Sequence, residues 1–221
     1  MTRKERLQIL RNADLYGITG ECFSHGRDNI AVAEDMMKAG IRVLQYREKE
    51  KSMREKYEQC ILLRKLTNCF HALFLVNDHI DLALAVEADG VHIGQDDLPL
   101  EEVRRLLGPE KIIGLSTHSP GQAEEAVRKK ADYIGVGPIY QTFTKKDVCD
   151  PVGLSYLRYA AKHVTVPFVT IGGVKEHNVA EVVKNGATCV CMVSEIAGAE
   201  NIQQKVKDIR IKMKEAQHEN I

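Results

Sequence analysis

Apolar runs with the two-residue period of strands alternate with stretches of helical period along most of this 221-residue chain. We expect eight strands, at Leu15–Thr19, Ile41–Arg47, Ala72–Asn77, Gly90–Ile93, Lys111–Ser116, Tyr133–Gly137, Pro167–Gly172 and Cys189–Ser194. The helical stretches that follow them are Ile30–Ala39, Met53–Cys69, Asp78–Glu87, Leu100–Leu107, Gly121–Lys130, Leu154–Lys162, Glu176–Asn185 and Asn201–Ala216. Parallel neighbours need a crossover long enough to hold a helix, so this alternation indicates βαβ units. Eight such units predict a closed α/β barrel, the (β/α)8 or TIM-barrel fold.

No Pro/Gly/Ser-rich linker or low-complexity segment divides the chain, so we expect one domain over residues 1–221. Residues 1–13 are predicted to form an extra amphipathic helix over the bottom of the barrel, and residues 15–216 the barrel itself. A weak internal repeat supports this reading. ADGVHIG at 88–94 resembles ADYIGVG at 131–137, each placing a helix end, a tight turn and a short strand in the same order.

The charge balance excludes one class of function. Lys plus Arg and Asp plus Glu each number 31, which excludes a globally basic nucleic-acid binder and leaves open only a local basic cluster. No apolar run is long enough for a membrane span, and the N-terminus does not resemble a secretory signal. The six cysteines lack metal-ligand spacing and are expected to be reduced thiols. A cytoplasmic protein without nucleic-acid or membrane partners is expected, with homo-oligomer formation left open.

In such a barrel the functional groups belong to the carboxyl ends of the strands. The second expected strand ends in QYREK, where alternation puts Gln45, Arg47 and Lys49 on one face. Asn77 and Asp78 follow the third strand. The two cations of this set suit a polyphosphate ligand.

Asp78 and Asp97 are hard oxygen ligands without Cys or His beside them, and that donor set favours Mg²⁺. Each could instead cap the helix that follows it. Arg47 and Lys49 could be solvated charges at the rim. His92 lies inside a strand and is expected to be structural.

The later strands end in groups suited to a second, smaller anion. Loops after the seventh and eighth strands hold a phosphate in many barrels, through backbone N–H groups. The residues at these ends, with two nearby hydroxyls, are Gly172, Gly173, Val193, Ser194, Thr142 and Thr144. The residues alone therefore predict a Mg²⁺-dependent enzyme that binds a pyrophosphate and, separately, a monophosphate.

Taken together and in order, these motifs resemble the thiamine-phosphate synthase family over about residues 15–196. The matching segments are QYREK at 45–49, ND at 77–78, GVHIGQDD at 90–97, GLS at 114–116, GPIY at 137–140, TFTK at 142–145, IGG at 171–173 and VS at 193–194. One such match is weak, whereas the ordered set is specific.

The resemblance implies transfer of a hydroxymethylpyrimidine group from its diphosphate to the ring nitrogen of hydroxyethylthiazole phosphate, with release of pyrophosphate. It implies a Mg²⁺-assisted dissociative substitution, with Asp78 and Asp97 as metal ligands. Catalytic roles would fall to Ser116, Lys145 and Arg47. The pyrimidine diphosphate would be bound by Gln45, Tyr46, Arg47, Glu48, Lys49, Asn77, Ser116 and Lys145, and the thiazole phosphate by Thr142, Thr144, Gly172, Gly173, Val193 and Ser194.

Three other interpretations remain. A thiazole tautomerase relative would share the barrel without needing the pyrophosphate and Mg²⁺ residues. A non-catalytic thiazole-phosphate-binding regulator would be expected to lose those residues first. A phosphosugar isomerase would need an acid/base pair that we do not find. Two departures from the family pattern stand out, Gly20 where many relatives carry Asp and Glu195 where Ala is usual.

Overall fold

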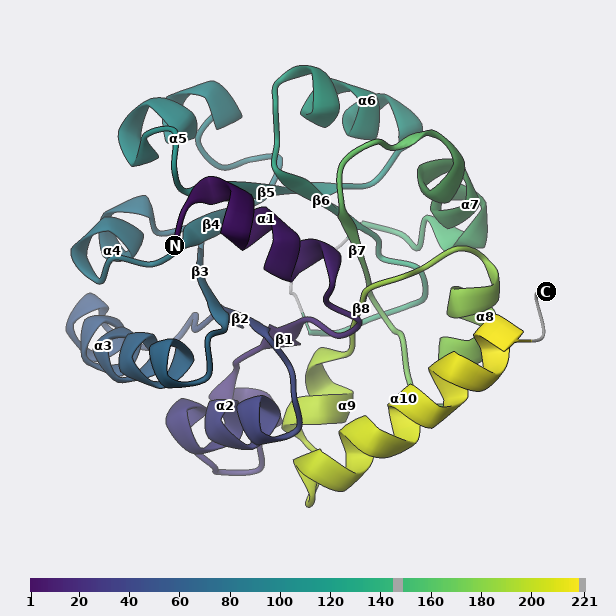
Figure 1. Cartoon of the computed structure of the whole chain (residues 1–221), viewed down its shortest axis with the longest axis horizontal. Coiled ribbons are helices and arrows are strands. Elements are labelled where there is room, and N and C mark those ends of the chain that lie inside the picture. Colours follow the sequence, from purple (N-terminus) through teal and green to yellow (C-terminus); the bar gives the residue numbers. More distant parts are fainter. Residues whose placement is uncertain (145–148, 219–221) are drawn as a thin grey trace.

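A computed structural model describes residues 1–144 and 149–218 of the chain. Eight parallel strands form a barrel inside a ring of helices (Figure 1). The strands are β1 (Gly17–Ile18), β2 (Val43–Tyr46), β3 (Leu73–Asn77), β4 (Gly90–Ile93), β5 (Ile112–Thr117), β6 (Tyr133–Val136), β7 (Phe168–Ile171) and β8 (Val190–Cys191). The α-helices are α1 (Arg3–Arg11), α2 (Asn29–Lys38), α3 (Met53–Cys69), α4 (Ile80–Ala85), α5 (Leu100–Leu107), α6 (Pro120–Arg128), α7 (Gly153–His163), α8 (Val179–Lys184), α9 (Val193–Ala197) and α10 (Ile202–His218). A 3-10 turn, η1, covers Glu21–Phe23.

The strands follow one another around the barrel in chain order, each paired in parallel with the next. Closure between the last strand and the first is made by a parallel bridge between Leu15 and Val190. There the Tyr16 N–H donates to the Val190 carbonyl at 3.0 Å, and the Val190 N–H donates to the Asp14 carbonyl at 2.9 Å. The (β/α)8 barrel predicted from the alternating periods is confirmed.

Alternation along each strand divides the apolar side chains between two cores. In β3, Phe74 and Val76 belong to the layer between sheet and helices, whereas Leu73 and Leu75 belong to the barrel interior. Leu10 of α1 joins the interior cluster from outside the sheet. Apolar side chains therefore fill the barrel at the end nearest α1. Polar side chains are left to the opposite end, where the strands finish, here called the upper end.

Helix α1 lies across one end of the barrel (Figure 1), and two buried carboxylates hold it there. Arg6 Nε donates to Asp89 at 2.9 Å, and Arg3 Nε donates to Asp132 at 2.8 Å. Each carboxylate also accepts a backbone N–H from the neighbouring strand. Asp89 and Asp132 are the acidic residues of the ADG and ADY segments, so the internal repeat corresponds to a repeated anchor for the predicted N-terminal helix.

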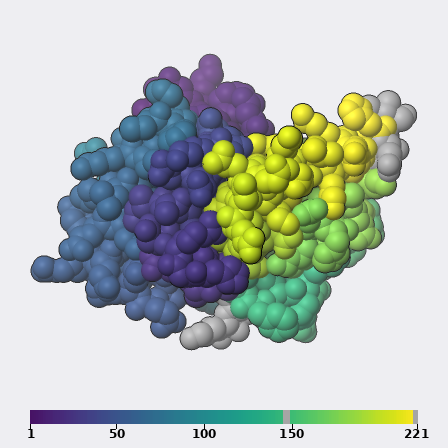
Figure 2. All heavy atoms as spheres, turned by 90° about the horizontal axis from the view of Figure 1, so that it is seen from below, coloured from purple at the N-terminus to yellow at the C-terminus, as the bar shows by residue number. Residues whose placement is uncertain are grey.

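The last helix closes the helical ring. α10 packs against both α8 and α2, so helices from the two ends of the chain lie side by side (Figure 2). Arg210 of α10 donates to both carboxylate oxygens of Asp14, at 2.6 and 2.9 Å, and to the carbonyl of Gly40 at 3.2 Å. This arginine therefore holds the segment in which the first and last strands meet.

Helix starts follow local capping chemistry. Ser52 and Glu55 form a reciprocal capping box at the start of α3, and Ser119 caps α6 with Pro120 in its first turn. Among the described residues, no helix combines the length and apolarity that crossing a bilayer requires.

The end of the eighth strand differs from the expectation. The predicted strand ran to Ser194, but β8 ends at Cys191 and the chain turns into the short helix α9. Ile196 and Ala197 of α9 are buried in the outer core. The apolar run continues from strand to helix without Gly or Pro between them, so periodicity alone placed the boundary too late.

Candidate active site

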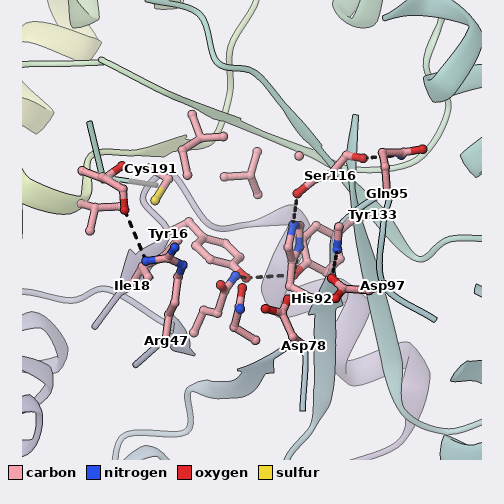
Figure 3. A pocket seen from close by; sticks show the side chains of 18 of the residues that line it. Tyr16, Ile18, Arg47, Asp78, His92, Gln95, Asp97, Ser116, Tyr133 and Cys191 are labelled. Carbon is pink, nitrogen blue, oxygen red and sulfur yellow. Dashed lines mark hydrogen bonds between the residues drawn. The ribbon is translucent and has the colours of Figure 1, made fainter. Parts of the chain in front are cut away.

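The upper end of the barrel holds a cavity of about 300 Å³, here named the central cavity (Figure 3). The side chains that define its polar wall come from the residue before β1, from β2 to β5 and the loops that follow them, and from the start of β6. They are Tyr16, Gln45, Arg47, Lys49, Asn77, Asp78, His92, Gln95, Asp96, Asp97, Ser116 and Tyr133. The structure thus brings together most of the residues that we expected at the diphosphate site.

Polar side chains form a hydrogen-bonded chain across the floor of this cavity (Figure 3). Gln45 Nε2 donates to Tyr16 Oη at 2.8 Å, and Tyr16 Oη lies 2.8 Å from Tyr133 Oη. His92 continues it, with Nδ1 3.0 Å from Tyr133 Oη and Nε2 3.0 Å from Ser116 Oγ. His92, which we expected to be structural, is therefore the neighbour of a predicted catalytic hydroxyl. Tyr16 and Tyr133 were missed because they look like core residues of apolar strands.

Two predicted cations occupy one side of the central cavity. Lys49 Nζ lies 2.8 Å from Asp78 Oδ2 in an ion pair at the rim. Arg47 is held at its backbone, where its N–H donates to Thr19 Oγ1 at 3.0 Å. Its guanidinium also approaches the carbonyl of Thr144, at 3.4 Å. The shared face predicted from strand alternation is present.

Asp78 and Asp97 face each other closely enough to perturb one another's ionisation. Burial would raise the pKa of Asp78, but Lys49, with smaller contributions from Asp97 and His92, outweighs burial, and the pKa is lowered. For Asp97, burial and the neighbouring Asp78 charge raise the pKa, although the Gly94 N–H opposes that rise. A cation between the carboxylates would relieve this repulsion.

The alternative that these carboxylates are helix caps is wrong. The residue before α4 is His79 and the residue before α5 is Pro99, and neither helix start has a side-chain cap. Asp97 instead accepts the Gly94 N–H at 2.6 Å within its own loop. Asp78 adopts a left-handed backbone with φ of 61°, which is uncommon outside glycine and turns its carboxylate toward the cavity.

A second hollow of about 290 Å³, here named the side cavity, adjoins the first. Thr144, Ile171, Cys191 and Val193 line both of them. The residues expected at a monophosphate all line it, namely Thr142, Thr144, Gly172, Gly173, Val193 and Ser194. A shared wall is what two substrates need if they are to react with each other.

Gly172 and Gly173 are required by the backbone here. Their φ angles are 97° and 65°, in the region that favours glycine. A Cβ on Gly172 would lie 2.4 Å from Pro138 Cα, and one on Gly173 would lie 2.5 Å from the Gln141 carbonyl oxygen. Glycines thus permit the close packing of two loops at the floor of the side cavity.

Lys175 is a site residue that the sequence analysis missed. It is the one basic side chain among the described residues that line the side cavity, and Nζ donates to Ser194 Oγ at 2.8 Å. Glu195, the departure noted above, pairs with Lys175 at 3.2 Å and with Lys205 at 3.8 Å. Lys175 stands two residues after the IGG segment, but no pattern in the sequence indicates that its side chain points into the side cavity.

Two residues assigned to the diphosphate site do not line either cavity. Tyr46 points into the outer core, where its hydroxyl donates to Gln59 Oε1 at 2.9 Å. Glu48 Oε1 accepts from the Glu21 N–H at 2.7 Å and from Asn29 Nδ2 at 2.9 Å. Tyr46 follows Gln45 in β2, and Glu48 keeps the same alternation in the residues just after the strand, so both side chains point away from the cavity. Lys145, predicted to be catalytic, lies outside the described residues.

Comparison with known proteins gives a consistent result. The family model described as thiamine monophosphate synthase matches residues 15–196. A thiamine-phosphate synthase of Pelotomaculum thermopropionicum is 57% identical over 210 residues, covering 95% of this chain and 96% of the relative. One of Lawsonia intracellularis is 54% identical, covering 90% and 92%. The solved thiamine phosphate pyrophosphorylase of Pyrococcus furiosus has a TM-score of 0.84 at 34% identity, covering 94% of this chain and 98% of its own.

Proposed function

Because this chain belongs to the thiamine monophosphate synthase family, we propose that it joins hydroxymethylpyrimidine diphosphate to hydroxyethylthiazole phosphate, with release of pyrophosphate. One observation supports this most strongly. A cavity carrying cations and paired carboxylates shares a wall with a second cavity built of glycines, hydroxyls and one lysine. Such a pair suits a diphosphate leaving group on one side and an unreactive monophosphate on the other.

At the diphosphate side, the proposed ligands are Gln45, Arg47, Lys49, Asn77 and Ser116, together with Lys145. Arg47 presents a planar fork suited to phosphate oxygens, and Lys49 and Lys145 add point charges. We assign the catalytic roles to Ser116, Lys145 and Arg47, because they would stabilise charge that develops as pyrophosphate leaves.

The donor set fits Mg²⁺, which Asp78 and Asp97 would hold. Both are hard oxygen ligands on the cavity wall, and a cation there would offset the Asp78 charge that raises the pKa of Asp97. The described residues contain no group of three or more His, Cys, Asp or Glu placed to hold a metal by themselves. Mg²⁺ commonly completes such a shell with water and substrate phosphate oxygens. When bound there, it supplies Lewis-acid charge for a departing pyrophosphate.

The proposed reaction is a dissociative substitution at the pyrimidine methylene carbon. The carbon–oxygen bond to the diphosphate breaks, and its electron pair leaves with pyrophosphate. The thiazole ring nitrogen then donates its lone pair to the methylene cation, so the step needs no protein nucleophile. Arg47 and Lys145 would neutralise the leaving group, while Ser116 would hold the pyrimidine diphosphate near the reacting carbon.

At the other side, backbone N–H groups around Gly172, Gly173, Val193 and Ser194 would hold the thiazole phosphate, with Thr142 and Thr144 as hydroxyl donors. Lys175 would supply the cation, because its ammonium already contacts Ser194. This phosphate stays bound to the thiazole throughout, so its ligands should affect affinity more than the chemical step.

Thr144→Val tests that division. We expect the KM for the thiazole phosphate to rise about tenfold with little change in kcat, because one hydroxyl donor to the phosphate is lost. Thr144→Ser keeps the hydroxyl and should stay near wild type. Steady-state kinetics with the thiazole phosphate varied would measure both. An unchanged KM in the valine variant would remove Thr144 from the phosphate site.

The proposed function is tested by incubating the purified chain with both phosphorylated substrates, with and without a Mg²⁺ chelator. We expect equal amounts of pyrophosphate and coupled product, and loss of both in excess chelator. Thiazole isomerisation without pyrophosphate release would instead indicate a tautomerase. Binding of the thiazole phosphate without turnover would indicate a regulator.

The partners follow from the same proposal. They are small phosphorylated molecules, with neither nucleic acid nor membrane required. We propose a cytoplasmic location, since phosphorylated substrates cross a bilayer poorly and must be made and used in one compartment.

A further inference from the structure

The hydrogen-bonded row of side chains on the floor of the central cavity joins Gln45 to Ser116 through three intermediate residues. We propose that its hydrogen bonds all run in one direction, so that Tyr16, Tyr133 and His92 are positioning residues that leave the Ser116 hydroxyl free to donate to the substrate. The role of that donated bond rests on the proposed function, whereas the direction of the chain does not.

The direction begins at Gln45. Its amide nitrogen can only donate, so Tyr16 Oη accepts at that end. The hydroxyl proton of Tyr16 then needs an acceptor of its own. Among the described residues, the other partner recorded for Tyr16 Oη is Tyr133 Oη, at 2.8 Å. A buried hydroxyl without an acceptor is costly, so Tyr16 donates to Tyr133.

The next two bonds follow from the chemistry of imidazole. Tyr133 Oη, accepting from Tyr16, directs its own proton to His92 Nδ1. Because Nδ1 accepts this bond it carries no proton, and an imidazole with one unprotonated nitrogen carries its single proton on the other, here Nε2. Nε2 therefore donates to Ser116 Oγ, and the Ser116 proton is left to point into the cavity that this residue lines.

Burial keeps the two phenols in the form that this chain needs. Tyr133 is fully buried and Tyr16 is 2% exposed. Burial raises the pKa of both hydroxyls, so both carry their protons at neutral pH. Neither can act as a pure acceptor and reverse the sequence of bonds.

A glycine makes room for the central contact. A Cβ on Gly114 would lie 2.1 Å from Tyr133 Cζ and 2.5 Å from His92 Nδ1. Any larger residue in this position of β5 would separate the tyrosine from the histidine. The contact between Tyr133 and His92 therefore depends on a space that the strand itself provides.

The test is Tyr133→Phe, which deletes the proton that Tyr133 donates to His92 Nδ1. Protein labelled with ¹⁵N-histidine would report the tautomer by NMR, with His92 assigned by its loss in His92→Asn. We expect the Nε2–H tautomer in the wild type and a shift toward Nδ1–H in Tyr133→Phe. Ser116 would then donate to His92, and kcat should fall about tenfold while the KM for the thiazole phosphate stays constant.

Tyr156→Phe is the matched control. Its hydroxyl is also buried and bonds to Thr117 Oγ1 at 2.6 Å, but Tyr156 lines neither cavity. This variant deletes a buried phenol hydroxyl without altering the hydrogen bonds from Gln45 to Ser116. The His92 tautomer and kcat should therefore both be unchanged. If Tyr133→Phe does not fold, Tyr16→Phe serves in its place, because it removes the proton that fixes the direction at Tyr133.

Combining Tyr133→Phe with Ser116→Ala shows whether Tyr133 acts on kcat through the Ser116 hydroxyl or only by stabilising the structure. If Tyr133 acts through Ser116, Tyr133→Phe should cause little further loss of kcat in the Ser116→Ala background. Additive losses, or an Nδ1–H tautomer in the wild type, would overturn the inference. A wild type with the Nε2–H tautomer but no transferase activity would refute the proposed function and leave the direction of the chain standing.

Discussion

Asp97→Ser should lower kcat/KM by about a hundredfold or more while the protein melts close to wild type. The carboxylate is proposed to hold Mg²⁺, and a Lewis acid acting on the leaving group contributes several kcal/mol, whereas serine cannot replace a hard anionic ligand. The fold should survive, because Asp97 caps no helix and serine can still accept the loop N–H of Gly94. A melting curve and a Mg²⁺ titration of kcat/KM are the measurements.

Excess Mg²⁺ should restore part of the rate in this variant, since Asp78 and the substrate oxygens remain as ligands. The titration midpoint should therefore move to higher Mg²⁺. Near-normal activity with an unshifted midpoint would mean that Asp97 only accepts the Gly94 N–H within its loop and does not bind the metal. The metal site would then have to be redrawn around Asp78 and Asp96.

Asp89→Ala should lower the free energy of unfolding by about 3–5 kcal/mol, the range found when one partner of a buried ion pair is removed. Asp89 is 3% exposed in its side chain and pairs with Arg6 and Arg64, whose side chains are 9% and 13% exposed. It also accepts the Phe74 N–H at 2.9 Å. Its loss would leave these donors without their anion in a place that water hardly reaches.

Denaturant unfolding measures this effect, with Glu102→Ala as the control. Glu102 pairs with Arg105 on the surface of α5, where both side chains are more than half exposed. We expect that control to change stability by no more than about 0.5 kcal/mol. Equal losses in the two variants would show that Asp89 does not anchor α1.

Much of the fold could be predicted because the barrel repeats one simple signal. Each strand is a short apolar run and each helix has its own period, so errors at single boundaries did not change the architecture. α9 was missed for a definite reason. Its apolar residues continue those of β8, and the turn between them is set by packing of Ile196 and Ala197 in the outer core.

The site was predictable where strand parity decided the direction of a side chain. Gln45, Arg47 and Lys49 follow the alternation and reach one cavity. Tyr46 and Glu48 of the same motif alternate with these residues, and their side chains bond to Gln59 and to the Glu21 N–H instead of lining the cavity.

Other site residues depend on contacts that the sequence does not contain. Tyr16 lies just before β1, His92 lies in β4 and Tyr133 begins β6, so only the closed barrel joins them into a hydrogen-bonded chain. Lys175 is one of many lysines in the chain, and its contact with Ser194 joins the loop after β7 to the start of α9. Such contacts arise from tertiary structure and have no local pattern.

The ion pair between Arg210 and Asp14 affects how the barrel can fold during synthesis. During synthesis the first strand leaves the ribosome long before the eighth, and the arginine that secures their meeting comes later still. Until then the nascent sheet has two open edges able to pair with other chains. Chaperone dependence should therefore be greatest for intermediates that end short of residue 210, and ribosome-bound chains of graded length would reveal it.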